Sequence, residues 1–222
     1  MKRSLLGICG SLVATVVLAQ GPVTSVNVVG FNKHSLEKGK LYLIASAFED
    51  IDGNRLTAAN VIGTQLPNGS QVHFYDGVTP YKTDTRNVTG WSSNVTFRGF
   101  MGFWVKVANT GTQTVYDVVL NGQVPFANTS SNIVSSGLNM LGFPYTADVA
   151  FTNTALYAQS VNGDQLHVYN TAANNYTTYT RNVTGWPAAA RSLILTQGLG
   201  FWYKSSRGTP VLDVEARPYP AN

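Results

Sequence analysis

Two short segments carry glutamine, histidine and tyrosine at every second position, and these residues are Gln71, His73, Tyr75, Gln165, His167 and Tyr169. Successive side chains of a β-strand point to opposite faces, so each set would share one face of a sheet. Such a face could contact sugar hydroxyls or hold a metal ion between two halves of the protein. We favour the simpler interpretation, a solvated or half-buried strand face without a ligand that was inherited by duplication. Two histidines with no acidic cluster nearby make a poor metal site, so we assign neither a metal nor a cofactor.

These segments belong to a longer internal repeat. Residues 86–91 and 181–186 share one sequence, Arg-Asn-Val-Thr-Gly-Trp. An arginine beside a tryptophan could bind a carbohydrate or a carboxylate, whereas the glycine suits a backbone conformation that other residues resist. Retention of the whole hexapeptide favours a folded corner. We therefore predict a structural role for Arg86, Gly90, Trp91, Arg181, Gly185 and Trp186.

Two further tryptophans recur in a Gly-Phe-Trp motif, at Trp104 and Trp202. In a strand, each indole would point away from the apolar residues on either side of it. An indole exposed on a sheet could stack on a sugar ring, and on this basis we include both as candidate ligand-binding residues. It could also be covered by the other copy or by a partner chain. We favour this second interpretation because a duplicated unit needs an interface.

No familiar catalytic motif occurs in the sequence. It has no nucleophile elbow, zinc-protease helix motif, phosphate loop or dinucleotide fingerprint. The 11 acidic residues are spread thinly, and none is singled out as half of a glycosidase carboxylate pair. We assign no catalytic residues. An active site built in only one copy stays open as a hypothesis.

The elements expected around these residues are almost all strands. Short apolar or alternating segments separated by glycine, asparagine, aspartate and proline are typical of sandwiches and barrels. Strands are predicted at 40–45, 71–75, 81–86, 115–120, 137–142, 165–169, 176–181 and 211–215 and through both Gly-Phe-Trp motifs. A short helix is predicted at 56–62, with a matching turn around 153–159. We therefore predict an all-β fold of two homologous tandem units, each a small β-sandwich or barrel-like sheet with one short helix.

The amino terminus has the pattern of a secretory signal peptide. Lys2 and Arg3 precede an apolar run over residues 5–18, and small residues favour cleavage after Ala19. The run is shorter than the roughly 20 residues that span a bilayer, so we expect no membrane span in the mature chain. We divide the chain into a signal peptide (1–19), an N-terminal strand segment (20–34), a first β repeat (35–125) and a second (126–222). Residues 24–31 alternate like a strand, and we expect them to pair with the closing strand of the second copy.

Composition limits the classes of partner. Charged residues make up 12% of the chain, against about 25% in typical globular domains. The formal charge of +4 falls to +2 without Lys2 and Arg3. That charge is too weak and too scattered for nucleic-acid binding, whereas a surface of amides and hydroxyls suits an extracellular setting.

The order of the motifs resembles that of uncharacterised secreted β-repeat proteins of Verrucomicrobia-like and Planctomycetes-like bacteria. The shared pieces are Val-Asn-Val-Val-Gly-Phe at 26–31, Leu-Ile-Ala at 43–45, the tyrosine-rich hairpin at 75–81 and Gly-Phe-Trp at 102–104. The resemblance implies a secreted β-repeat protein. It transfers no activity and no catalytic residues.

These observations favour an exported, non-enzymatic protein of the extracellular space or cell surface that acts in structural assembly or binding. Its expected partners are further copies of itself or an extracellular glycan. The alternative is a carbohydrate-binding module that uses tryptophan and tyrosine with asparagine and glutamine. A glycan-acting hydrolase is the third hypothesis.

Overall fold

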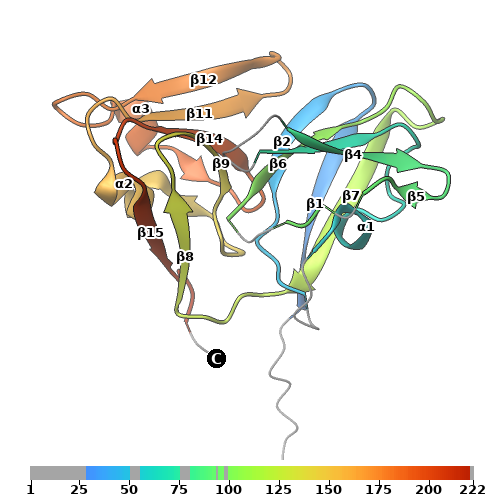
Figure 1. The fold of residues 1–222 in the computed structure, drawn as a ribbon, viewed down its shortest axis with the longest axis horizontal. Coiled ribbons are helices and arrows are strands. Elements are labelled where there is room, and N and C mark those ends of the chain that lie inside the picture. The colour runs from blue at the N-terminus through green and yellow to red at the C-terminus, as the bar shows by residue number, and fades with distance from the viewer. Residues whose placement is uncertain (1–28, 51–55, 76–80, 94, 98–99, 221–222) are drawn as a thin grey trace, which may run out of the picture.

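The structure is a computed structural model and describes residues 29–50, 56–75, 81–93, 95–97 and 100–220 (Figure 1). The predicted signal peptide at 1–19, and the part of the N-terminal segment before residue 29, lie outside these residues. Strands dominate, with three short α-helices among the described residues. The prediction of an all-β fold is confirmed.

The first half of the structure, strands β1 to β7, contains two antiparallel sheets. One has five strands in the order β2-β6-β3-β4-β5, and the other is the two-stranded ribbon β1–β7. The elements of this half are β1 (Val29–Glu37), β2 (Leu41–Ala45), α1 (Ala58–Val61), β3 (Gln71–Phe74), β4 (Lys82–Asn87), β5 (Gly90–Trp91), β6 (Gly102–Lys106) and β7 (Val115–Gln123).

The second half, strands β8 to β15, contains a four-stranded sheet of order β12-β11-β14-β9, the ribbon β15–β8 and the short pair β10–β13. Its elements are β8 (Thr129–Val134), β9 (Gly137–Gly142), β10 (Val149–Ala150), the 3-10 helix η1 (Phe151–Asn153), α2 (Ala155–Gln159), β11 (Gln165–Asn170), β12 (Asn175–Thr180), α3 (Ala188–Arg191), β13 (Ile194–Leu195), β14 (Gly200–Ser205) and β15 (Val211–Ala216).

The larger sheets of the two halves share a strand order. The run β2-β6-β3-β4 in the first half matches β9-β14-β11-β12 in the second. The register agrees as well, because His73 lies opposite Trp104 in one sheet and His167 lies opposite Trp202 in the other. A duplication would require this agreement, although common descent of the two units stays a prediction.

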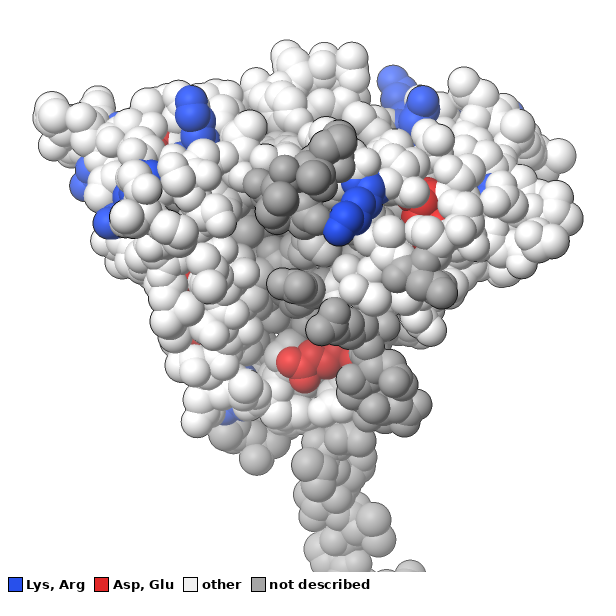
Figure 2. Space-filling model, viewed as in Figure 1, with Lys and Arg blue, Asp and Glu red and all other residues white. Residues whose placement is uncertain are grey.

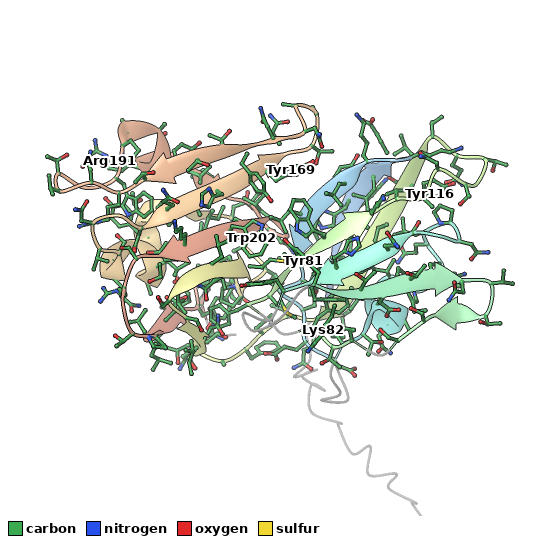
Figure 3. The ribbon with its side chains drawn as sticks, turned by 45° about the horizontal axis from the view of Figure 1, so that its top comes forward. Tyr81, Lys82, Tyr116, Tyr169, Arg191 and Trp202 are labelled. Atoms are coloured by element: carbon green, nitrogen blue, oxygen red, sulfur yellow. The ribbon has the colours of Figure 1, made fainter. Side chains whose placement is uncertain are left out.

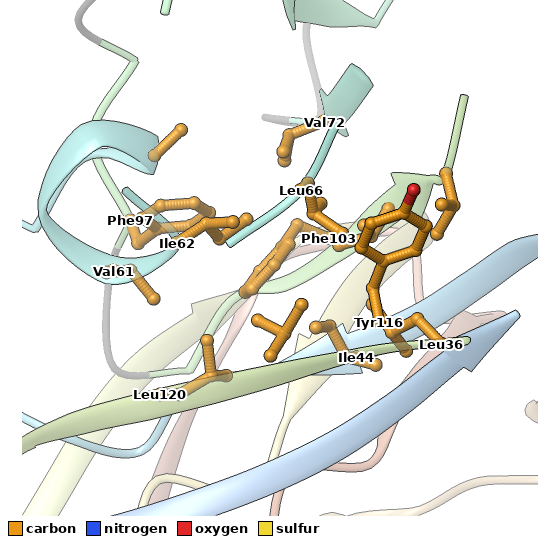
Figure 4. Close-up of a cluster of buried hydrophobic side chains, with 14 of the residues drawn as sticks. Leu36, Ile44, Val61, Ile62, Leu66, Val72, Phe97, Phe103, Tyr116 and Leu120 are labelled. Carbon is orange, nitrogen blue, oxygen red and sulfur yellow. The ribbon is translucent and has the colours of Figure 1, made fainter. Parts of the chain in front are cut away.

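Each half has its own apolar core. In the first half, Val72 and Phe74 of β3 are fully buried because strand alternation points both toward the β1–β7 ribbon. They pack there with Phe103 of β6 and with Val118 and Leu120 of β7 (Figure 4). A second cluster fills the space between the four-stranded sheet and β8. Each larger sheet therefore has one face against its own core, which leaves the opposite face free for other contacts.

The N-terminal strand does not pair as we predicted. β1 pairs antiparallel with β7, the closing strand of the first half, and β15 pairs with β8 instead. Leu36 of β1 and Tyr116 of β7 lie opposite each other and are both buried in the first core. The ribbon therefore covers its own sheet, and its apolar face would be exposed if β1 left to join the other half. The strand also continues to Glu37, beyond the boundary that we placed at residue 34.

Candidate binding site at the junction of the two halves

The free faces of the two larger sheets meet in an aromatic junction. Trp104 and Trp202 are only 5% and 6% exposed. The Trp104 ring lies 4.8 Å from that of Tyr169, and the Trp202 ring lies 5.1 Å from that of Tyr75. Each tryptophan is thus covered by a tyrosine of the other half. The structure therefore supports coverage by the other copy, and neither indole face is open for stacking on a sugar.

Two further tyrosines border this junction and remain partly open to solvent. Tyr81 lies 6.3 Å from Trp202, and Tyr176 lies 6.3 Å from Trp104, both in edge-to-face geometry. Their exposed fractions are 46% and 43%. Figure 3 shows Tyr81, Trp202 and Tyr169 gathered where the two halves meet. Tyr81 and Tyr176 are therefore the most exposed aromatic residues at this junction.

Backbone hydrogen bonds join the halves in a reciprocal way. The N–H of Ala45 at the end of β2 donates to the carbonyl of Gly198, at 2.8 Å. The N–H of Gly142 at the end of β9 donates to the carbonyl of Phe100, also at 2.8 Å. Ala45 and Gly142 occupy corresponding places in the two sheets. The junction therefore rests on paired main-chain contacts as well as on aromatic packing.

The glycine of each Gly-Phe-Trp motif permits this close approach of the two halves. A Cβ atom on Gly102 would lie 2.6 Å from the carbonyl oxygen of Leu141, and one on Gly200 would lie 2.6 Å from that of Ile44. Such distances are shorter than real contacts allow, so any side chain here would push the halves apart. The sequence showed that this glycine recurs, but the reason lies in a contact between segments about 40 and 155 residues apart.

The glutamines and histidines of the two stripes do not gather around a common centre. Nδ1 of His73 lies 2.8 Å from the hydroxyl of Thr83, and Nδ1 of His167 lies 2.8 Å from that of Thr178. Burial, followed by the charge of a nearby lysine, lowers the pKa of both histidines. Within the described part of the chain, no three His, Cys, Asp or Glu residues are grouped to hold a metal ion. Gln71 and Gln165 likewise lie opposite lysines on the neighbouring strands. The stripe tyrosines pack into the junction itself, whereas the histidines border it, with rings 6.4 Å (His73) and 6.2 Å (His167) from those of Tyr81 and Tyr176.

The tryptophans of the repeated hexapeptide fasten its turn to the core. The indole N–H of Trp91 donates to the carbonyl of Gly63, and that of Trp186 donates to the hydroxyl of Ser160, both at 2.8 Å. Trp186 is 5% exposed and packs edge-to-face on Phe151. These contacts are those of an anchored corner.

The arginines and glycines of the hexapeptide contribute through the backbone. The N–H groups of Arg86 and Arg181 donate to main-chain carbonyls at 2.8 and 2.9 Å, which extends each hairpin. Gly90 and Gly185 have φ angles of 134° and 109°, a region that side chains other than glycine rarely adopt. Their conformation turns the chain from one strand into the next.

The second half buries two carboxylates that the sequence had not drawn to our attention. Asp213 and Glu215 are 1% and 3% exposed and share the inward face of β15. Glu215 accepts the N–H of Ala155 at 2.9 Å, whereas Asp213 has only a 3.5 Å contact from the amide of Gln159. Burial, with a smaller effect of the Glu215 charge, raises the pKa of Asp213 to about 7. The adjoining cavity of about 10 Å³ has no room for a sugar.

These acids replace apolar residues of the first half. β7 closes the first half as β15 closes the second, and at the positions that match Asp213 and Glu215 it buries Val118 and Leu120 in its core. A comparison of the sequences of β7 and β15 could have revealed that acids stand in place of apolar residues. The alternation of β15 is misleading, however, because the apolar Leu212 and Val214 lie on the exposed face and the acids on the buried one. The assignment of faces therefore depended on tertiary structure.

A third buried acid is fully hydrogen-bonded. Asp164 accepts the hydroxyl of Tyr203 at 2.6 Å and the N–H groups of Val161 and Ser206 at 2.8 Å. Burial alone would raise the pKa of Asp164, but these hydrogen bonds outweigh it and lower the pKa. Burial and the bond to Asp164 raise the pKa of Tyr203. The hydrogen bond between Tyr203 and Asp164 holds the C-terminal part of β14 against the loop that precedes β11.

A cleft of about 1010 Å³ opens between the halves. One wall is the outward face of β8–β15 and the edge strand β9, including Ile133, Leu138 and Leu212, and the other comes from the first half, including Tyr75. Hydroxyl and amide side chains lie between the apolar ones, and Lys82 is the only charged residue among the described residues that line the cleft. The volume is at the upper end of the range for ligand sites. This cleft, bordered by the aromatic junction, is our candidate binding site.

None of the family models, curated proteins or solved structures compared with the chain matches it. Among the described residues, no helix combines the length and apolar character needed to cross a membrane. Functional inference therefore depends on the geometry of the junction and on the surface around it.

Proposed function

We propose that this chain is an exported, non-enzymatic protein of the extracellular space or cell surface, which acts by associating with further copies of itself. The proposal is supported by the internal contacts of the recurring residues, which leave few of them available to bind a substrate. The recurring tryptophans and the hexapeptide corners make internal contacts. The neighbouring carboxylates of β15 adjoin a cavity too small for a substrate.

The observation that carries the proposal is the exposed apolar surface around the cleft, where Lys82 is the one charged side chain among the described lining residues. On the outward face of β8–β15, Ile133, Leu212 and Val214 are 62%, 57% and 41% exposed. Leu138 on the neighbouring strand is 44% exposed, and it lines the cleft with Ile133 and Leu212. A group of exposed apolar side chains in and beside a large cleft is typical of a protein interaction site. Figure 2 shows few charges on the face in view, with one basic and one acidic group near the middle, where the halves meet.

Electron microscopy and sedimentation of the purified protein over a range of concentrations test this function. We expect polymers whose amount rises with concentration. Because the surface is almost uncharged, raising the salt concentration should not dissolve them. A strict monomer at high protein concentration would contradict the proposal.

Carbohydrate binding is the second candidate, and the exposure of Tyr81 and Tyr176 favours it. Their rings are 46% and 43% exposed beside the covered tryptophans, where each could stack on a sugar. A glycan array should then give hits that are lost in the Tyr81→Ala, Tyr176→Ala double variant. An array without hits would remove this candidate and leave self-association untouched.

A further inference from the structure

The two Asn-Val-Thr turns present the most exposed large apolar side chains of the described chain. Val88 is 86% exposed and Val183 is 83% exposed. Asn87 pairs with Gly90, and Asn182 exchanges two backbone hydrogen bonds with Gly185. A valine and a threonine therefore form the tip of each turn, and both tips project into solvent.

The fold explains the presence of the other residues of the hexapeptide but not that of the valine. Glycine supplies the positive φ, and tryptophan anchors the turn to the core. The side-chain oxygen of Asn182 accepts the N–H and the hydroxyl of Thr184, at 3.0 and 2.7 Å. Turn tips usually carry glycine, asparagine, aspartate, serine or proline. A bare valine in both turns contributes no packing within the molecule, which indicates a contact outside it.

The two tips point away from each other. The turn between β4 and β5 lies at one end of the long axis of the molecule, and the turn after β12 lies at the other end (Figure 1). The cleft lies between these ends, where the halves meet. A tip and a cleft are therefore different surfaces in different places, and a molecule carries both.

We propose that an Asn-Val-Thr tip of one copy inserts into the cleft of a second copy. This inference rests on the proposed self-association and names its contact. The tip offers the amide of asparagine, the two methyl groups of valine and the methyl and hydroxyl groups of threonine, and its three residues carry no charge. The cleft offers Ile133, Leu138 and Leu212 for the methyl groups, with Ser131 and Asn132 between them for the polar groups. The tip therefore brings no charged side chain into the cleft, and Ile133, Leu138 and Leu212 lie on the wall opposite the first half, which contributes Lys82.

This contact gives an open chain rather than a closed dimer. Because tip and cleft are different surfaces, the interface is heterologous, and such an interface propagates unless the rotation happens to close a ring. Each copy can receive a tip and donate either of its own. Loss of one tip should therefore weaken assembly, and loss of both should weaken it by about tenfold or more.

Aspartate substitutions at exposed positions test the contact, because a buried unpaired carboxylate is costly in the complex and harmless in the free protein. The Val88→Asp, Val183→Asp double variant lacks both tips, and Ile133→Asp blocks the cleft. Each should raise the concentration at which polymers appear by about tenfold or more. The matched control is Val115→Asp, since Val115 is 45% exposed on β7 and does not line the cleft. Thermal unfolding should show that all the variants fold.

Mixing the two deficient variants gives the decisive result. The Val88→Asp, Val183→Asp variant lacks tips but keeps its cleft, whereas Ile133→Asp keeps its tips but has a blocked cleft. A mixture of the two should form complexes of two or three copies that grow no further. If the Val88→Asp, Val183→Asp variant still formed full polymers, the tip contact would be overturned while self-association stayed intact. Loss of polymers in both variants without complexes on mixing would overturn it too. A wild-type protein that stays monomeric would overturn the proposed function and this inference together.

Discussion

Replacement of Asp213 by asparagine should make the protein more stable at neutral and alkaline pH. The carboxyl group is 1% exposed, and its one contact, from the amide of Gln159, is long at 3.5 Å. Its nearest ionisable neighbour on the strand, Glu215, is also acidic and also buried. Asparagine has the same shape, carries no charge and can keep the amide contact. The substitution therefore removes mainly the cost of ionising a buried carboxyl.

The size of the effect follows from the displaced pKa. Burial raises the pKa of Asp213 from 3.8 to about 7. At about 1.4 kcal/mol for each pKa unit, the difference amounts to about 4 kcal/mol. Between these two values the folded protein retains a proton that the unfolded chain has released. The contribution of this carboxyl to stability is thus fully present below about pH 4 and is lost as the pH rises to about 7.

Urea unfolding followed by tryptophan fluorescence measures this effect, with the variant compared with wild type at about pH 4 and about pH 8. The stability difference should move in favour of Asp213→Asn by about 4 kcal/mol over that interval. Asp117→Asn is the control, because hydrogen bonds from Lys33 and Ser35 lower the pKa of Asp117, and its removal should favour the variant less as pH rises. A difference for Asp213→Asn that does not change with pH would refute the reasoning.

The same denaturation assay checks three further substitutions. Trp202→Ala should lower the free energy of unfolding by about 3–5 kcal/mol, because the indole is buried between the halves; a loss of less than about 1 kcal/mol would mean that the junction is not tightly packed. Gly200→Ala should cost about 1–3 kcal/mol, because its Cβ would meet the carbonyl of Ile44, whereas Gly208→Ala has open space and should change stability by less than about 0.5 kcal/mol. Trp186→Phe should cost about 1–3 kcal/mol through loss of a buried hydrogen bond, and an unchanged stability would show that the indole N–H is not needed to anchor the turn.

Local sequence signals were sufficient for the fold class and for many of the elements. The predicted helix at 56–62 contains α1, and the segment at 153–159, predicted as a matching turn, contains the short helix α2. The alternation of 71–75 assigned Val72 and Phe74 to the core, where both are buried. These features depend on side-chain periodicity and on turn residues, which act within a few positions along the chain.

The errors and omissions concern contacts between distant segments. The partner of β1 was predicted wrongly because alternation shows that a strand has an apolar face but does not show which sheet it covers. The burial of Asp213 was missed because an acid in a strand is normally expected to face solvent. The cleft also depends on the placement of β8–β15 against the first half, for which no local pattern exists.

The reciprocal junction explains why recurring aromatic residues need not mark a ligand site. A single half would leave Leu43 and Trp104 on an open sheet face, and the other half would do the same with Met140 and Trp202. When the halves meet, these four side chains form one buried cluster, so the repeated aromatics are retained for packing in both copies. We therefore propose that function depends on the surfaces that this packing leaves exposed. These are the cleft, where the halves differ, and the two valine tips, which are identical in sequence and are not packed within the molecule.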